Sequence, residues 1–264
     1  MSVHSPIIDV APLGSNESTH SQTSSRLDKS MNNAVRTRQR MLAVSLPITA
    51  ALYIGAEGVN PKGTDQIITT TAIALKVLPI AAKHSTQLYA SGSLTELALG
   101  AVAVSYAAIA VLVRKRGSRA ATIAALIGGI GAFCGAIVNV FVGINLAAAA
   151  TAHVTREAAA RILVSNFNSG PGQAFTDFYA FSESFAPIIM GIALWQSRHV
   201  PRWLAVLFAV GFELAEQTAS VGIARVALQM APFAVAMVLL SVRIWQAATD
   251  RVVPNHALTL ADDQ

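Results

Sequence analysis

Four polar residues follow one another at helical spacing within an apolar stretch of the chain. Glu213, Glu216, Gln217 and Ser220 are three or four residues apart, so a helix would present them on one face. An acidic side chain inside a membrane helix is costly and usually faces the protein interior or water, which makes it a default functional candidate. Two carboxyl groups this close could share a proton or bind a cation.

Other polar residues lie at similar depth in neighbouring apolar segments. With a rise of about 1.5 Å per residue, they fall at the midplane or in the outer half of the expected spans. The sequence therefore predicts an acidic, amide-lined cup that opens outward. The candidate ligand-binding residues are Glu213, Glu216, Gln217, Glu183, Glu96 and Asn139. Two alternatives stay open: Glu57, Glu96 and Asp177 are solvated or paired near the outer interface, or Glu213 is a structural acid hydrogen-bonded to Asn139.

The sequence offers no pattern for ordinary catalysis or metal binding. His84 and His153 have no ligand partner at one-turn spacing, and there is neither a helical His-Glu-x-x-His nor a convincing Gly-x-Ser-x-Gly elbow. Cys134 is the only cysteine, which excludes an intramolecular disulfide. We therefore expect no catalytic residues, no metal, no cofactor and no enzymatic activity.

The composition of the chain indicates the class of protein in which these residues lie. Of 264 residues, 53% are hydrophobic and only 12% are charged, far fewer charged residues than the roughly 25% of a soluble domain. The net charge of +5 is explained by basic residues at membrane junctions, so nucleic-acid binding is not expected. The predicted fold class is an all-α, polytopic membrane helix bundle.

Six apolar segments qualify, or nearly so, as transmembrane helices of about 20 residues. They are Met41–Gly58, Ser93–Val113, Ala120–Ala149, Phe178–Gln196, Trp203–Ala219 and Ala227–Trp245. The expected domains are a disordered, Ser/Thr/Asn-rich cytoplasmic tail over 1–40, a six-span membrane domain over 41–246, and a cytoplasmic tail over 247–264.

Basic residues predict the orientation of these spans. Most of the 19 Lys and Arg residues fall in the tails or at every second junction, so both termini are expected in the cytoplasm. Each of the three tryptophans falls at a predicted cytoplasmic end. The apolar stretch Ile67–Ala82 contains Lys76 and Pro79, and a crossing there would reverse the charge rule downstream. We expect it to be an outer-surface helix that lies on or dips into the bilayer.

Small residues recur at three- and four-residue intervals in the third span. Gly128, Gly131, Gly135 and Gly143 are among them. Such a face allows another helix backbone to approach closely, so this span is expected at the centre of the bundle.

The junction Arg198-His199-Val200-Pro201-Arg202-Trp203-Leu204-Ala205-Val206-Leu207 resembles the turn between spans four and five in uncharacterised six-span bacterial membrane proteins of a domain-of-unknown-function type. The resemblance implies a multi-pass protein of the bacterial inner membrane, and it supplies no binding residues. Pro201 suits a helix start, while Arg202 and Trp203 suit the inner interface.

The leading interpretation is a non-enzymatic multi-pass protein that binds a small cationic or amphiphilic ligand, or a membrane partner, from the outer side. The alternatives are an ion- or proton-coupled small-molecule transporter and an intramembrane enzyme. Three spans per half would suit a transporter, although no sequence repeat relates the halves. Expected partners are the lipid bilayer, the ligand, and a membrane-protein partner or second copy of the chain.

Overall fold

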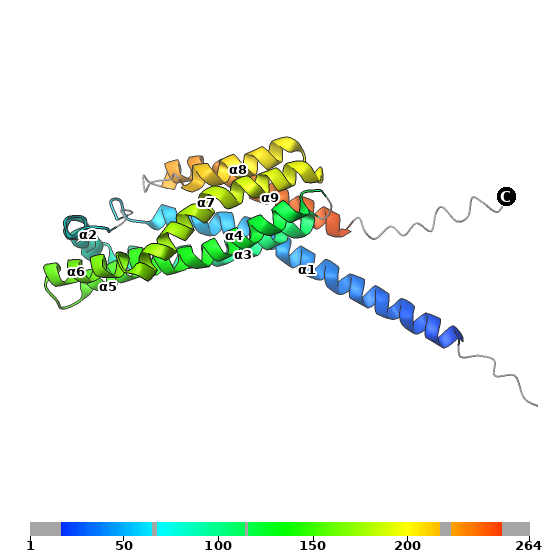
Figure 1. The fold of residues 1–264 in the computed structure, drawn as a ribbon, viewed down its shortest axis with the longest axis horizontal. Coiled ribbons are helices and arrows are strands. Elements are labelled where there is room, and N and C mark those ends of the chain that lie inside the picture. The colour runs from blue at the N-terminus through cyan, green and yellow to red at the C-terminus, as the bar shows by residue number, and fades with distance from the viewer. Residues whose placement is uncertain (1–16, 65–67, 114–115, 217–222, 250–264) are drawn as a thin grey trace, which may run out of the picture. The chain divides into compact units, whose positions relative to one another are not determined.

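Helices account for nearly all of the chain that the structure describes. This computed structural model describes residues 17–64, 68–113, 116–216 and 223–249, and these ranges contain no strand (Figure 1). In chain order the elements are α1 (Glu17–Val59), α2 (Thr71–Lys83), α3 (Ser85–Leu112), α4 (Ser118–Asn139), the π-helix η1 (Val140–Ile144), α5 (Asn145–Thr151), α6 (Arg156–Phe167), α7 (Gly170–Ser197), α8 (Arg202–Glu216) and α9 (Ile223–Thr249).

The chain divides into two compact units between Arg38 and Gln39, close to the predicted boundary between tail and membrane domain. In the first unit, the described residues from Glu17 onward are helical, which differs from the disordered tail expected from composition. Extending an existing helix fixes one residue for each hydrogen bond gained, so α1 can propagate into polar sequence that would not start a helix alone. The remaining helices belong to the second unit.

Within the described ranges, five helices are long and apolar enough to cross a membrane. They cover Asn33–Val59, Ser85–Leu112, Ser118–Thr151, Gly170–Ser197 and Val226–Thr249, which match five of the six predicted spans. The remaining predicted span corresponds to α8, whose 15 described residues reach about 22 Å. Because residues 217–222 are outside the described ranges, the count of six stays a prediction.

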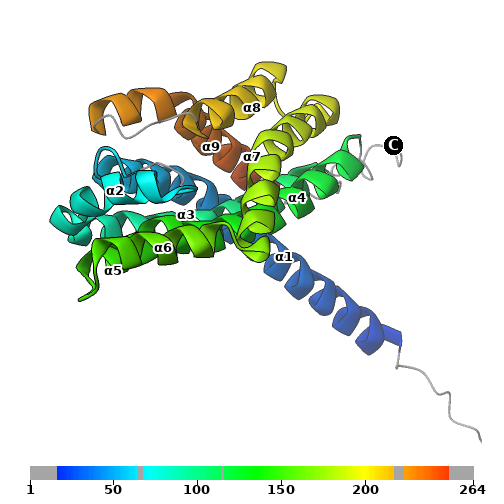
Figure 2. The same cartoon turned by 60° about the vertical axis from the view of Figure 1, so that its left-hand side comes forward.

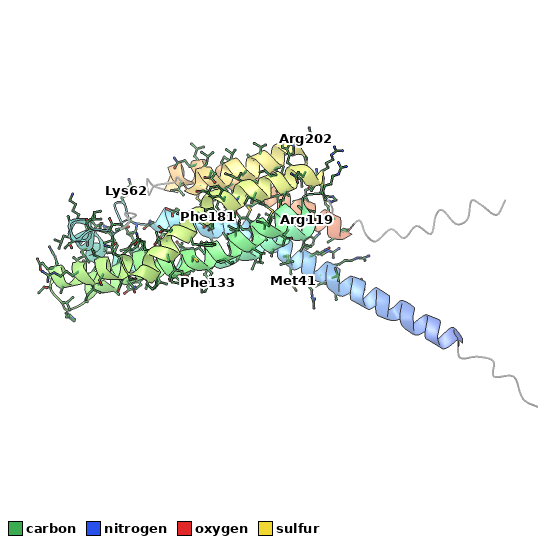
Figure 3. The ribbon with its side chains drawn as sticks, viewed as in Figure 1. Met41, Lys62, Arg119, Phe133, Phe181 and Arg202 are labelled. Carbon is green, nitrogen blue, oxygen red and sulfur yellow. The ribbon has the colours of Figure 1, made fainter. Side chains whose placement is uncertain are left out.

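The basic junctions meet at one end of the bundle. The Arg40 guanidinium donates to Thr249 Oγ1 at 3.4 Å and lies 5.3 Å from the Trp245 ring centroid, so α1 enters the bundle where α9 ends. At the same end Arg202 lies 5.1 Å from the Trp195 ring centroid. Figure 3 shows Met41, Arg119 and Arg202 toward this end, which we call the basic end, and Lys62 toward the other.

The small residues of α4 fit against side chains of α3 and α7. A β-carbon on Gly131 would overlap the Ser182 side chain, and one on Gly135 would overlap the Tyr179 ring. Gly128 faces the Tyr106 ring in the same way. The predicted close approach along this helix is confirmed, and α4 packs more extensively with α7 than any other two helices do among the described residues.

The end opposite the basic end carries a helical cap. The continuous helical stretch Ser118–Thr151 has 34 residues, about 51 Å, and so exceeds a hydrocarbon core of about 30 Å. Its final part, α5, packs with α2 and α6 around a second apolar core (Figure 2). The core residues of α2 are Ala74, Val77, Leu78 and Ala81, whereas Lys76 is exposed.

This packing modifies the prediction for Ile67–Ala82. As predicted, α2 is not among the candidate spans. Its apolar face is covered by α5 and α6, however, instead of being available to lie on the bilayer. The sequence shows that the helix is amphipathic but does not show that a second short helix, α6, supplies a protein partner for it.

Candidate functional site

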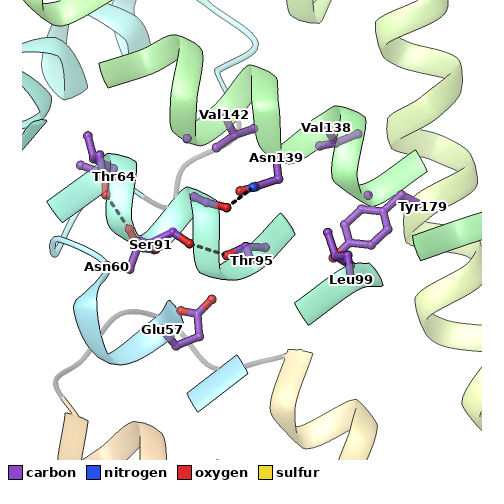
Figure 4. Close-up of a pocket in the computed structure, with 14 residues that line it drawn as sticks. Glu57, Asn60, Thr64, Ser91, Thr95, Leu99, Val138, Asn139, Val142 and Tyr179 are labelled. Carbon is purple, nitrogen blue, oxygen red and sulfur yellow. Dashed lines mark hydrogen bonds between the residues drawn. The ribbon is translucent and has the colours of Figure 1, made fainter. Parts of the chain in front are cut away.

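A polar cavity lies toward the cap, between the end of α1, the first half of α3, and the α4–η1 junction. Its volume is about 240 Å³ (Figure 4). Its polar lining residues are Glu57, Asn60, Thr64, Ser91, Thr95 and Asn139. Leu99 and Tyr179 also line it and lie on the side that faces the centre of the bundle.

The first half of α3 supplies one wall because its polar residues are one helical turn apart. Ser91 is buried and donates its hydroxyl hydrogen bond to the Ala56 carbonyl of α1 at 3.0 Å. Thr95 donates to the Ser91 carbonyl at 3.0 Å. These bonds satisfy the two hydroxyl hydrogens within the protein, which leaves oxygen lone pairs to face the cavity.

The end of α1 and the turn after it supply the opposite wall. Thr64 donates to the Pro61 carbonyl at 2.7 Å and to Asn60 Oδ1 at 3.2 Å, which fixes the turn. In Figure 4 the Glu57 side chain extends from α1 into the space near Ser91 and Thr95. This carboxylate is the charged group among the described lining residues.

Asn139 connects the cavity to a break in the α-helical pattern. Its Nδ2 group donates to the Gly92 carbonyl at 2.9 Å and to Glu96 Oε1 at 3.1 Å. The next five residues, Val140–Ile144, form the π-helix η1, and Val142 and Gly143 line the cavity. Short π-helical segments often occur at functional sites because they reposition side chains within a helix.

The charged and neutral polar groups of the cavity lining are unevenly distributed between residue types. Among the described residues that line it, none is Lys or Arg, and the lining combines one carboxylate with amide and hydroxyl groups. Lys62 belongs to the nearby turn but is exposed and does not line the cavity. Such a lining can accept hydrogen bonds from an ammonium group or supply oxygen atoms to a cation.

A smaller void lies next to the cavity, on its side toward the centre of the bundle. Leu99 and Tyr179 line both spaces. The void has a volume of about 10 Å³, close to the space needed for one water molecule, and Tyr53, Ser182 and Glu183 are among its lining residues. Glu183 therefore lines this smaller void and does not line the larger cavity.

The structure brings together only some of the predicted site residues. Glu96 and Asn139 form a hydrogen-bonded pair, in which Asn139 lines the cavity and Glu96 does not. Glu213 lies on α8, does not line the cavity, and its buried Oε1 has no hydrogen-bond partner among the described residues. Glu216's side chain and all of Gln217 lie outside the described residues. The expected cup around Glu213 therefore stays a prediction, and the polar cavity among the described residues lies at α1, α3 and α4.

Sequence reasoning missed several of the residues that form this cavity. Ser91 was outside the predicted second span because that span was expected to begin at Ser93, whereas α3 begins at Ser85. Glu57 was identified only as an acid near the interface. A useful signal was the polar spacing Ser91, Thr95 and Glu57, Asn60, Thr64, which repeats every three or four residues on both segments.

The fold and this cavity define an all-helical protein with several helices suited to crossing a membrane. Comparison of the chain with protein-family models, with curated proteins and with solved structures found no match.

Proposed function

We propose that this chain is a six-span, non-enzymatic membrane protein that binds a small cationic ligand in the polar cavity from the outer side. The observation that carries the proposal is the lining: Glu57 with amide and hydroxyl groups, and no basic side chain among the described lining residues. A cation loses hydration when it enters a cavity, so it needs fixed oxygen atoms and a negative charge in return.

The size of the cavity limits the ligand. A volume of about 240 Å³ falls below the roughly 300 to 1,000 Å³ of sites for drug-sized ligands. A hydrated metal cation or a compact organic ammonium ion fits this volume. The mixed lining favours a ligand with one charged group and few apolar atoms.

The proposed orientation places the basic end in the cytoplasm, as the positive-inside rule requires, and the cavity on the outer side. The contacts of Arg40 with Trp245 and Thr249 support a common side for the start of the first span and the end of the last. We also propose the bacterial inner membrane as the location, on the basis of the sequence resemblance.

A cation-coupled transporter is the second candidate function. It is favoured by the void at Glu183, which shares Leu99 and Tyr179 with the cavity and so lies next to it. The π-helix η1 at the cavity provides a segment whose hydrogen bonding can change. Catalysis has less support, because the lining hydroxyls of Ser91 and Thr95 donate their hydrogens to backbone carbonyls and not to a base that would activate them.

Calorimetric titration of the purified full-length chain with methylammonium, guanidinium, tetramethylammonium, sodium and potassium tests this function. At least one of these cations should bind, and Glu57→Gln should weaken that binding about tenfold or more, because a hydrogen bond to a charged group contributes about 1.5 to 3 kcal/mol. Glu157→Gln is the matched control, since Glu157 is exposed in the first turn of α6 and does not line the cavity. Equal affinities in the two variants would contradict the proposal.

A further inference from the structure

A separate, apolar groove runs between α7 and α8 near the basic end. Its volume is about 420 Å³. Its walls include Ile188 and Ile192 of α7 and Val206 and Val210 of α8, which are each about half exposed. The groove is therefore open to whatever surrounds the bundle, and its lining is almost entirely apolar.

Small residues create the floor of this groove. A β-carbon on Gly191 would lie 2.9 Å from the Ala209 β-carbon and 3.2 Å from the Ala205 carbonyl oxygen. The two helices thus approach closely at their small residues, and the branched side chains on either side stand above that contact. This arrangement forms the groove along the two helices.

The guanidinium group of Arg202 lies at one end of the groove. Trp195 lines the groove, and the Arg202 guanidinium carbon lies 5.1 Å from the Trp195 ring centroid. An arginine at this distance is held by the ring while its N–H groups can still donate to a planar or tetrahedral anion. Arg198 and His199, in the short connection between the helices, are also exposed. The described residues that line the groove include no carboxylate.

The length of the groove and the positive charge at its end together indicate which molecule binds in it. From Ile188 to Trp195 the groove follows α7 for about 10 Å, which is about two thirds of one hydrocarbon leaflet of about 15 Å. An occupant must combine an apolar chain with an anionic head. We propose that this groove binds one acyl chain of an anionic phospholipid from the leaflet at the basic end, with the lipid phosphate at Arg202. This inference is independent of the ligand in the polar cavity.

The test uses Trp195 as the reporter. The full-length chain with Trp203→Phe and Trp245→Phe keeps Trp195 as its single tryptophan. It is reconstituted in phosphatidylcholine vesicles that contain an equal minor fraction of either brominated phosphatidylglycerol or brominated phosphatidylcholine, because bromine on an acyl chain quenches a tryptophan that it contacts. Quenching should give an apparent affinity for phosphatidylglycerol about fivefold higher, which corresponds to about 1 kcal/mol for one basic residue at a lipid surface.

Two variants separate a defined site from general charge attraction. Arg202→Gln in the same background should abolish the preference for phosphatidylglycerol, whereas Arg202→Lys should keep part of it. Arg119→Gln removes one charge at the basic end from an exposed residue outside the groove and should keep the preference. The proposal is overturned if the two lipids quench Trp195 equally, or if Arg119→Gln and Arg202→Gln reduce the preference to the same extent. The Arg119→Gln variant also serves as a folding control, because it shows whether the loss of one positive charge at the basic end disturbs folding.

Discussion

The amide of Asn139 joins two helices at the polar cavity. It donates to the Gly92 carbonyl and to Glu96 Oε1, both on α3, from the last residue of α4. The α-helix gives way to the π-helix η1 immediately after it. A single side chain thus connects the α3 wall of the cavity with the irregular segment that completes the lining.

Asn139→Ala should destabilise the protein by about 1 to 3 kcal/mol, because it leaves Glu96 Oε1 without this partner in a half-buried setting. Asn145→Ala is a suitable control, since Asn145 is similarly half-buried and begins α5 just beyond η1. Thermal unfolding in one detergent compares the two variants. Equal losses would mean that the Asn139 bonds are not important for stability.

Glu213 differs from Asn139 because one of its side-chain oxygen atoms is not hydrogen-bonded to the described residues. Its Oε1 is buried and has no hydrogen-bond partner among the described residues. Glu213→Gln should therefore leave the unfolding temperature unchanged or raise it, because the substitution removes a charge that is costly in an apolar setting. A clear decrease of stability in the same thermal assay would show that the carboxylate makes an interaction that the fold requires.

The sequence could predict Glu96 and Asn139 because acids and amides are rare within apolar spans. It could not predict that Glu213 is absent from the lining of the polar cavity, since depth along a helix does not specify which helices are neighbours. Contributions from Ser91 and Thr95 were equally hard to identify, because hydroxyl residues are common in membrane helices and cost little there.

At the scale of elements, α4 is the helix around which α3 and α7 pack. Its glycines face Tyr106, Ser182 and Tyr179, and these contacts depend on the absence of β-carbons. The recurrence of small residues predicted this role from sequence. The change from α-helix to the π-helix η1 was not predictable, because Val140–Ile144 has an ordinary apolar composition.

Gly131→Ala should destabilise the protein by about 1 to 3 kcal/mol, because its β-carbon would overlap the Ser182 side chain. Gly129→Ala is the matched control two residues away, where a β-carbon would meet nothing within 4 Å. The control should be neutral or stabilising by up to about 1 kcal/mol, as expected for Gly to Ala in a helix. Chemical denaturation in mixed micelles can measure both, and equal destabilisation would contradict the packing.

In the cap, sequence periodicity predicts the apolar face of α2 but not what that face packs against. The apolar positions of α2 are those of an amphipathic helix, and α2 is not among the helices long enough to cross a membrane. Whether the apolar face contacts lipid or protein depends on α6, a helix about 75 residues later in the chain that adds Ala159, Ala160 and Leu163 to the same core. This long-range partner is what local sequence could not reveal.

At the scale of the whole molecule, the basic junctions and the polar cavity occupy opposite ends of the bundle. Arg40, Arg119 and Arg202 mark one end, whereas the cavity adjoins the α2, α5 and α6 cap. Basic residues predicted this grouping well, because the charge bias acts on every junction independently. Five of the predicted spans are matched by helices of suitable length, and α8 remains the proposed sixth.

Orientation can be tested with single cysteines in a Cys134→Ala background. A cysteine at Ser118 should resist a membrane-impermeant thiol reagent in intact cells, and one at the exposed Ser165 of α6 should react. Permeabilised cells provide the control in which both positions react. Labelling of Ser118 from outside would reverse the proposed topology.

The central claim is that the polar cavity opens outward and selects cations through Glu57. The most direct measurement uses the Thr95→Cys variant in the Cys134→Ala background. It compares the rates at which two methanethiosulfonate reagents, added outside intact cells, react with the new cysteine. One reagent carries an ammonium group and the other a sulfonate group. Both rates are normalised to those of a cysteine at Ser165, on the cap surface away from the cavity. The cationic reagent should react about tenfold faster, and Glu57→Gln should remove most of this difference. Equal normalised rates, or a preference that Glu57→Gln leaves unchanged, would contradict the account.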